Sequence, residues 1–91
     1  MYNTLFMTNK LEILKKRLIY RASYRGTKEM DILLSTFVNK YIDSFDEPLL
    51  NELEAFLNFE DETILGFYQY DIIKNQIDKN KIAIIFKNFK I

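Results

Sequence analysis

The sequence places three arginines, Arg17, Arg21 and Arg25, at intervals of four residues. Residues four apart lie on one side of an α-helix, so the three guanidinium groups are expected to project from a single stripe. A guanidinium group binds carboxylates and phosphates through paired hydrogen bonds. The stripe is therefore either a solvated helix face or a site that contacts phosphates, as in a nucleic-acid-binding protein.

Other kinds of chemistry are largely excluded by composition, because the chain has no histidine and no cysteine. It therefore lacks the usual general base, the commonest zinc ligand, and every nucleophile arrangement that pairs histidine with serine or cysteine. Disulfides and thiolate metal sites are excluded as well. We expect no enzymatic activity, no catalytic residue and no metal site.

The length of 91 residues allows one small domain, which must be stabilised by apolar packing in the absence of disulfides. The eight Phe and six Tyr can supply that bulk. Two Gly and one Pro leave few breaks, and apolar residues recur at intervals of three and four, so helices are expected throughout.

Charge is segregated along the chain although the formal net charge is zero. Every charged residue from 10 to 28 is basic except Glu12, and every charged residue from 29 to 62 is acidic except Lys40. An acidic middle third argues against general polyanion binding. Neither a targeting segment nor an apolar run long enough to cross a membrane is visible, so we expect a soluble cytoplasmic protein. Frequent Ile, Asn, Lys and Phe would suit an AT-rich bacterial genome.

The first helix is expected to begin near Asn9, whose side chain can cap it, with Glu12 completing a capping box. It is expected to end before Gly26, because glycine readily takes the left-handed conformation found just past a helix end. Tyr20 and Tyr24 lie four apart beside the arginine stripe, and we expect one of them in the core. The apolar face consists of Leu11, Leu14, Leu18 and Ala22.

Three further helices follow from capping residues and apolar periodicity. Thr27 is expected to cap a second helix directly after Gly26. Ser44 and Glu47 form a capping box for a third, with Pro48 in its first turn, and Asp61 is expected to cap a short fourth. The second helix has the clearest amphipathic pattern, formed by Met30, Leu33, Leu34, Phe37, Val38 and Tyr41.

The end of the chain gives a mixed pattern. Apolar residues up to Ile77 could continue a helix, whereas Ile82, Ile84 and Phe86 alternate as in a strand. A single strand without a partner is implausible, so residues 71–81 are interpreted as a fifth helix or helical extension. The prediction is an all-α fold, a single compact bundle of four to five short helices.

One domain is expected over residues 1–91. Residues 1–8 are predicted to be a flexible tail. Residues 82–91 are predicted to form an apolar tail that either docks on the bundle or is disordered.

One stretch resembles the signature of the succinate dehydrogenase assembly factor family, whose members are also called flavinylation factors. It runs from residue 20 to residue 34, as Tyr-Arg-Ala-Ser-Tyr-Arg-Gly-Thr-Lys-Glu-Met-Asp-Ile-Leu-Leu. The family hallmark is Arg-Gly-x-x-Glu followed by an apolar residue, Asp and a Leu-rich helix. Arg25, Gly26, Glu29 and Asp31 occupy these positions here. The similarity continues through residues 43–57 and 60–67.

This resemblance implies a helical protein that binds the flavoprotein subunit of succinate dehydrogenase, and in some bacteria of fumarate reductase. Such a protein promotes covalent attachment of FAD to a histidine of that subunit. The resemblance further implies partner-binding residues Arg21, Arg25, Gly26, Glu29 and Asp31. FAD would belong to the partner, with no cofactor bound permanently by this chain. Replacing Arg25 or Glu29 by alanine is expected to leave the fold intact and to lower covalent flavin.

Two other classes of function stay open from the residues alone. One is a small nucleic-acid-binding or regulatory module that uses the basic first helix. The other is an interaction protein of the toxin–antitoxin kind that uses the apolar tail. Under the assembly-factor hypothesis we expect no nucleic acid, no membrane insertion, and a monomer when the protein is free.

Overall fold

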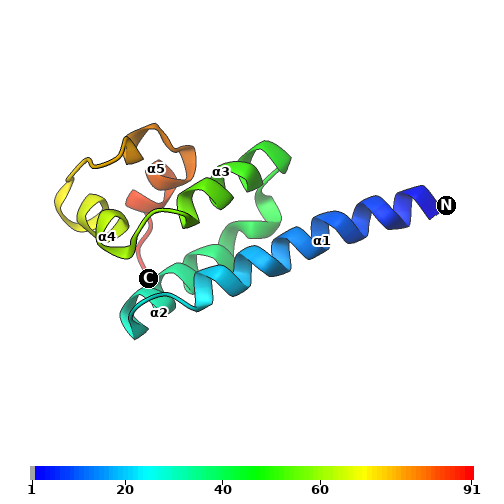
Figure 1. Ribbon diagram of the computed structural model, residues 1–91, viewed down its shortest axis with the longest axis horizontal. Coiled ribbons are helices and arrows are strands. Elements are labelled where there is room, and N and C mark those ends of the chain that lie inside the picture. Colours follow the sequence, from blue (N-terminus) through cyan, green and yellow to red (C-terminus); the bar gives the residue numbers. More distant parts are fainter. Residues whose placement is uncertain (1) are drawn as a thin grey trace.

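A long first helix and a group of shorter ones make up the fold, shown as a computed structural model in Figure 1. The structure describes the backbone of residues 2–91 and the side chains of residues 10–91. The described residues contain no strand, so the predicted all-α bundle is confirmed. The elements are α1 (Tyr2–Ser23), α2 (Lys28–Tyr41), the 3₁₀ turn η1 (Ile42–Ser44), α3 (Glu47–Leu57), α4 (Asp61–Tyr70), the 3₁₀ turn η2 (Ile77–Lys79) and α5 (Lys81–Lys87).

Helix α1 begins earlier than its sequence pattern suggested. The helix starts at Tyr2, so Asn9 lies inside it and the predicted cap at Asn9 is wrong. No glycine or proline stands between Tyr2 and Lys10 to end a helix. The predicted tail at residues 1–8 is therefore helical from Tyr2 onward, while Met1 lies outside the described residues. In Figure 1 this end of α1 extends away from the other helices.

Helix α2 confirms the prediction made from its capping residue and apolar face. The Thr27 hydroxyl accepts a hydrogen bond from the amide of Met30 at 3.2 Å, which satisfies a free amide of the first turn. Its apolar face packs against Leu18 and Ala22 of α1, both fully buried. The buried residues of α2 are Met30, Leu33, Leu34, Phe37 and Val38, with Tyr41 half-buried.

Helix α3 starts two residues later than predicted, and the capping box of Ser44 and Glu47 is wrong. Asp46 is the cap, with its carboxylate accepting from the amide of Leu49 at 3.1 Å. Ser44 ends η1 instead and donates its hydroxyl hydrogen to the carbonyl of Tyr41 at 2.6 Å. The predicted position of Pro48 in the first turn of α3 is confirmed.

The helix expected over residues 71–81 is absent apart from the short turn η2. Asp71, Asn75 and Gln76 all have positive φ, at 58°, 55° and 58°, which interrupts a right-handed helix. Asp71 ends α4 in the left-handed conformation, and its amide donates to the carbonyls of Gly66 and Phe67. Residues 71–76 are therefore a loop between α4 and η2.

The apolar C-terminal segment docks on the bundle as helix α5, so the alternative of a flexible tail over residues 82–91 is wrong. Asn80 caps α5 by accepting from the amide of Ala83 at 2.9 Å, and it donates to the carbonyl of Glu52 in α3 at 3.0 Å. The strand-like alternation was misleading, because Ile84 is exposed. The side chains that face the core are Ile82, Ala83, Phe86 and Phe89.

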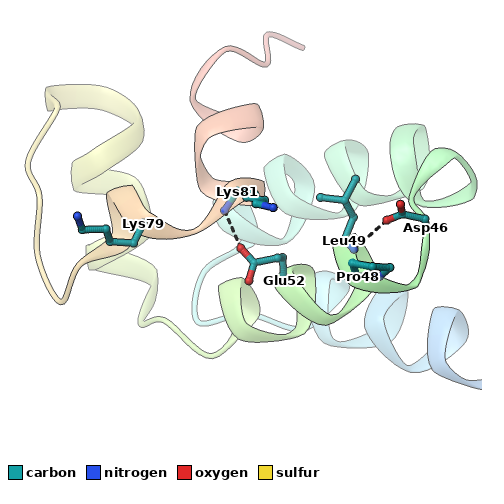
Figure 2. Close-up of a pocket in the computed structure, with 6 residues that line it drawn as sticks. All are labelled: Asp46, Pro48, Leu49, Glu52, Lys79 and Lys81. Carbon is teal, nitrogen blue, oxygen red and sulfur yellow. Dashed lines mark hydrogen bonds between the residues drawn. The ribbon is translucent and has the colours of Figure 1, made fainter.

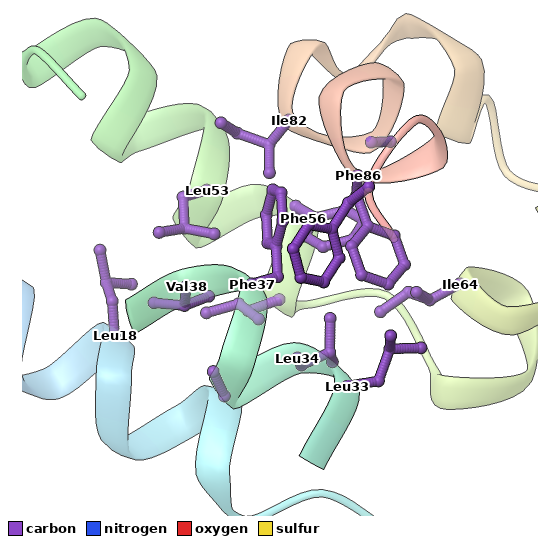
Figure 3. Packing of buried hydrophobic residues seen from close by; sticks show 14 of the residues in the cluster. Leu18, Leu33, Leu34, Phe37, Val38, Leu53, Phe56, Ile64, Ile82 and Phe86 are labelled. Carbon is purple, nitrogen blue, oxygen red and sulfur yellow. The ribbon is translucent and has the colours of Figure 1, made fainter. Parts of the chain in front are cut away.

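Three phenylalanines from three helices meet at the centre of the core (Figure 3). The ring of Phe86 lies 5.1 Å from that of Phe37, edge to face, and 5.4 Å from that of Phe56. All three side chains are fully buried. This cluster joins α5 to α2 and α3, so the C-terminal helix is part of the core and is not an exposed interaction segment.

The structure also bears on membrane insertion. In the part of the chain that the structure describes, every helix is too short or too polar to span a bilayer.

Candidate functional site

The junction of α1 and α2 carries most of the residues singled out from the sequence. Helix α1 ends at Ser23, whose hydroxyl donates to the carbonyl of Ile19 at 2.8 Å, and α2 begins at Lys28. The connection between them, residues 24–27, lies against the connection between α3 and α4. Segments more than 30 residues apart in sequence are therefore joined at this corner.

Arg25 is the residue that joins the two connections. Its Nε donates to the Asp61 carboxylate, and its two terminal nitrogens donate to the carbonyls of Leu57 and Phe59, each at 2.8 Å. Only 10% of its side chain is exposed. Arg25 therefore satisfies the carbonyls at the end of α3 and presents little of its guanidinium group to solvent.

Gly26 is exposed and its φ is not positive, so the predicted left-handed conformation is wrong. Its amide donates to the second carboxylate oxygen of Asp61 at 2.8 Å. A Cβ atom at this position would lie 3.0 Å from that oxygen. The position favours glycine because the Asp61 carboxylate approaches the backbone closely, and not because of a special backbone angle.

Asp61 is the functional candidate that sequence reasoning missed. It was predicted to cap α4, but Glu60 is the N-cap and makes no capping hydrogen bond through its side chain. Asp61 is the first residue of α4, and its carboxylate is turned toward Arg25 and Gly26. An acid at the start of a helix can stabilise that helix or bind a neighbouring segment. Only the approach of the α1–α2 connection in the fold shows that Asp61 has the second role.

The two acids of the predicted site have different environments. Asp31 is partly buried, and its carboxylate accepts a hydrogen bond from the backbone amide of Arg25. Glu29 is exposed in the first turn of α2 and makes no side-chain hydrogen bond or ion pair among the described residues. Asp31 stabilises the corner from within, whereas Glu29 is available to a partner.

The predicted arginine stripe is confirmed only in part, because Arg17 and Arg21 lie on α1 whereas Arg25 lies beyond its end. Arg17 pairs with Glu54 at 3.4 Å, and Arg21 donates to the side chain of Asn58. Arg25 continues the series by bonding to Asp61. Each of the three arginines thus has a polar partner within the chain.

Tyr20 and Tyr24 form an exposed aromatic pair beside this corner. Their rings lie 4.4 Å apart, with 62% and 68% of the residues exposed. The prediction that one of them belongs to the core is wrong. Tyrosine is enriched in protein interfaces, since it buries a large apolar area while keeping a hydroxyl in contact with water.

An open, shallow depression lies between the two connections. It is too open to enclose a small molecule, and the described residues contain no group of acids that could hold a metal ion. A macromolecular surface suits it better. The residues that line it are Tyr24, Arg25, Gly26, Thr27, Asn58, Phe59, Glu60, Asp61 and Glu62.

A second depression, between α3 and the segment from η2 to α5, is shown in Figure 2. Its acidic side chains are already used by the fold. The Asp46 carboxylate caps α3, and Glu52 accepts from the amide of Lys81 at 2.9 Å. The side chains of this depression therefore stabilise α3 and its contact with α5, and we assign no ligand to it.

Comparison with known proteins identifies similarity over most of the chain. Residues 16–89 match the model of a family described as flavinator of succinate dehydrogenase. The mitochondrial succinate dehydrogenase assembly factor 2 of Scheffersomyces stipitis is 43% identical over 51 residues, which are 56% of this chain and 34% of that protein. The corresponding protein of Schizosaccharomyces japonicus is 37% identical over 54 residues, 59% of this chain and 38% of that protein.

A third relative is the mitochondrial succinate dehydrogenase assembly factor 2-A of Drosophila willistoni. It is 54% identical over 37 residues, which are 41% of this chain and 24% of that protein. The matched part thus spans well under half the length of these relatives. All three are eukaryotic proteins named as mitochondrial, so they lend no support to a bacterial origin. No solved structure matches the chain.

Proposed function

The chain belongs to the flavinator of succinate dehydrogenase family, and from that premise we propose that it is an assembly chaperone for the flavoprotein subunit of this enzyme. It binds that subunit in the cytoplasm and promotes covalent attachment of FAD to it. The partner supplies both the FAD site and the histidine that becomes linked to the flavin, since this chain has no histidine. The chain itself performs no catalysis and holds no cofactor permanently.

The single observation that supports this proposal most is the exposed side of the α1–α2 junction. We call this side the corner surface and define it as Tyr24, Gly26, Thr27, Glu29 and Glu60, all of which are exposed. The surface lies on a corner that is fixed from behind by Arg25 and Asp61. A pre-formed surface loses little conformational entropy on binding, which favours affinity.

The proposed mechanism is preferential binding. The chaperone binds the flavoprotein conformation in which the histidine and FAD are correctly placed, and it binds other conformations less tightly. A partner with equal affinity for all conformations would shift no population. The chaperone therefore needs contacts that only the competent conformation offers, and the unpaired carboxylate of Glu29 is suited to such a contact.

Partner binding can be tested by co-expressing the tagged chain with the flavoprotein subunit of succinate dehydrogenase and purifying the tagged protein. We expect a stable complex with the wild-type chain. Glu29→Ala and Glu29→Gln are expected to lower the affinity by about tenfold or more, as for a central interface contact. Failure of the wild-type chain to retain the flavoprotein would contradict the proposal.

Glu47→Ala is the matched control for this experiment. Glu47 is an exposed glutamate in the first turn of α3, just as Glu29 is in the first turn of α2. Each substitution removes the same helix-dipole interaction, worth about 0.3–1 kcal/mol. Glu47→Ala is therefore expected to lower stability as Glu29→Ala does and to leave partner affinity unchanged.

A further inference from the structure

The Asp61 carboxylate bonds to Arg25 and Gly26, the first two residues of the family hallmark in this chain. One oxygen accepts from Arg25 Nε and the other from the Gly26 amide, both at 2.8 Å. Asp61 lies 35 residues beyond Gly26 in the sequence and opens a different helix. It is therefore the tertiary contact that fixes the backbone of the corner surface against α4.

The same contact explains the absence of a side chain at position 26. A Cβ atom there would be 3.0 Å from the Asp61 oxygen and 4.0 Å from Asp61 Cγ. The carboxylate cannot withdraw freely, because Arg25 holds its other oxygen. An alanine at position 26 would therefore displace either the carboxylate or the corner backbone.

We propose that Asp61 is a positioning residue for the partner-binding surface, and that glycine is required at position 26 because of Asp61 and not because the partner approaches the backbone there. This inference rests on the proposed function, since it concerns the surface that binds the flavoprotein. Asp61 acts through Arg25 and Gly26 and itself needs no contact with the partner.

The two substitutions Gly26→Ala and Asp61→Ser form a double-mutant cycle that tests this inference through affinity for the flavoprotein subunit. A serine is too short to reach the position of the carboxylate oxygens, so it relieves the close contact. We expect each single variant to bind the flavoprotein about tenfold more weakly than the wild type. The double variant is expected to bind no more than about threefold more weakly than the single variant with the lower affinity. Independent losses that multiply in the double variant would overturn the inference.

Gly66→Ala is the control for adding a methyl group at a glycine. The Cβ atom at Gly66 would meet its nearest neighbour, Ile72 Cβ, at an ordinary 3.7 Å. This variant is expected to bind the flavoprotein as the wild type does. A loss of affinity equal to that of Gly26→Ala would contradict a specific role for the contact with Asp61.

A second measurement needs no partner and therefore separates failure of this inference from failure of the proposed function. Hydrogen exchange at the Gly26 amide, followed by NMR in the isolated full chain, is expected to be at least about tenfold faster in Asp61→Ser. The core amides of Leu34 and Val38 should keep their protection, which a general loss of structure would remove. An unchanged Gly26 amide would overturn the inference.

Asp61→Asn keeps the experiment decisive if Asp61→Ser does not fold. The amide nitrogen of asparagine cannot accept a hydrogen bond, so this variant can keep only one of the two bonds made by the carboxylate. Its Gly26 exchange rate or its affinity is expected to fall between those of the wild type and Asp61→Ser. Wild-type behaviour in both would contradict the positioning role.

Discussion

Replacing Arg25 by alanine is predicted to destabilise the fold, which differs from the expectation drawn from the sequence alone. The substitution removes three hydrogen bonds of 2.8 Å. It leaves the carbonyls of Leu57 and Phe59 without these donors and the Asp61 carboxylate without its cation. A charge-assisted bond is stronger than a neutral one, and a buried group left unpaired costs its full desolvation penalty.

The magnitude follows from the burial of the pair. Removing one partner of a buried ion pair costs about 3–5 kcal/mol. Asp61 is 24% exposed, so water can partly replace the guanidinium group and the lower end, about 3 kcal/mol, applies. For a domain of this length, about 1 kcal/mol shifts the melting temperature by about 4–8 °C, so the predicted decrease is about 12–24 °C.

Thermal unfolding of the isolated chain, followed by circular dichroism at the helical band, measures this decrease. Arg17→Ala is the matched control, because Arg17 is an arginine of the preceding helix α1 and forms an ion pair with Glu54. That pair is long, at 3.4 Å, and its side chains are 58% and 40% exposed. Such surface pairs contribute about 0–1 kcal/mol. If Arg25→Ala lowered the melting temperature no more than Arg17→Ala, the structural role assigned to Arg25 would be refuted.

Three further predictions concern other parts of the molecule. Gly66→Ala should raise the melting temperature by about 2–8 °C, because alanine is favoured over glycine within a helix by about 0.5–1 kcal/mol; an unchanged or lower value would contradict the ordinary van der Waals contact with Ile72 described for a Cβ atom there. Phe86→Ala should cost about 3–5 kcal/mol in denaturant unfolding, since it empties the centre of the core; a cost below about 1 kcal/mol would show that α5 is not docked as described. Replacing Tyr20 and Tyr24 together by alanine should leave unfolding nearly unchanged and weaken flavoprotein binding, whereas equal binding would exclude this pair from the interface.

Helix α2 shows what could be predicted from the sequence. Its start depends on Thr27 and the amide of Met30, which are three residues apart, and its core face follows from apolar periodicity. Both are local properties. Local patterns also predicted the four-residue spacing of the three arginines, though not their partners Glu54, Asn58 and Asp61.

Gly26 shows what could not be predicted. A glycine after a helix is compatible with a left-handed residue and equally with a close approach by another segment. The choice depends on Asp61, which reaches Gly26 only through tertiary packing. Asp61 was itself interpreted as a cap, because its partners Arg25 and Gly26 are distant in sequence and the residues next to Asp61 do not indicate them.

The C-terminal residues illustrate a different limit. Ile82 and Phe86 are compatible with one side of a strand and equally with one side of a helix, since they are four residues apart. The structure resolves this through Asn80, whose side chain caps α5 and also bonds to Glu52 of α3. A seven-residue helix is too short to be stable alone, so its formation depends on packing against the bundle.

Covalent flavin in the partner is the most direct measure of the account as a whole. The flavoprotein subunit would be expressed with the wild-type chain, with Glu29→Ala, with Glu47→Ala, or alone, and covalent flavin read from its fluorescence in a denaturing gel. We predict a strong signal with the wild-type chain and with Glu47→Ala, and a weak one with Glu29→Ala or with no chaperone. Equal fluorescence in the presence and absence of the chain would contradict its role in flavin attachment.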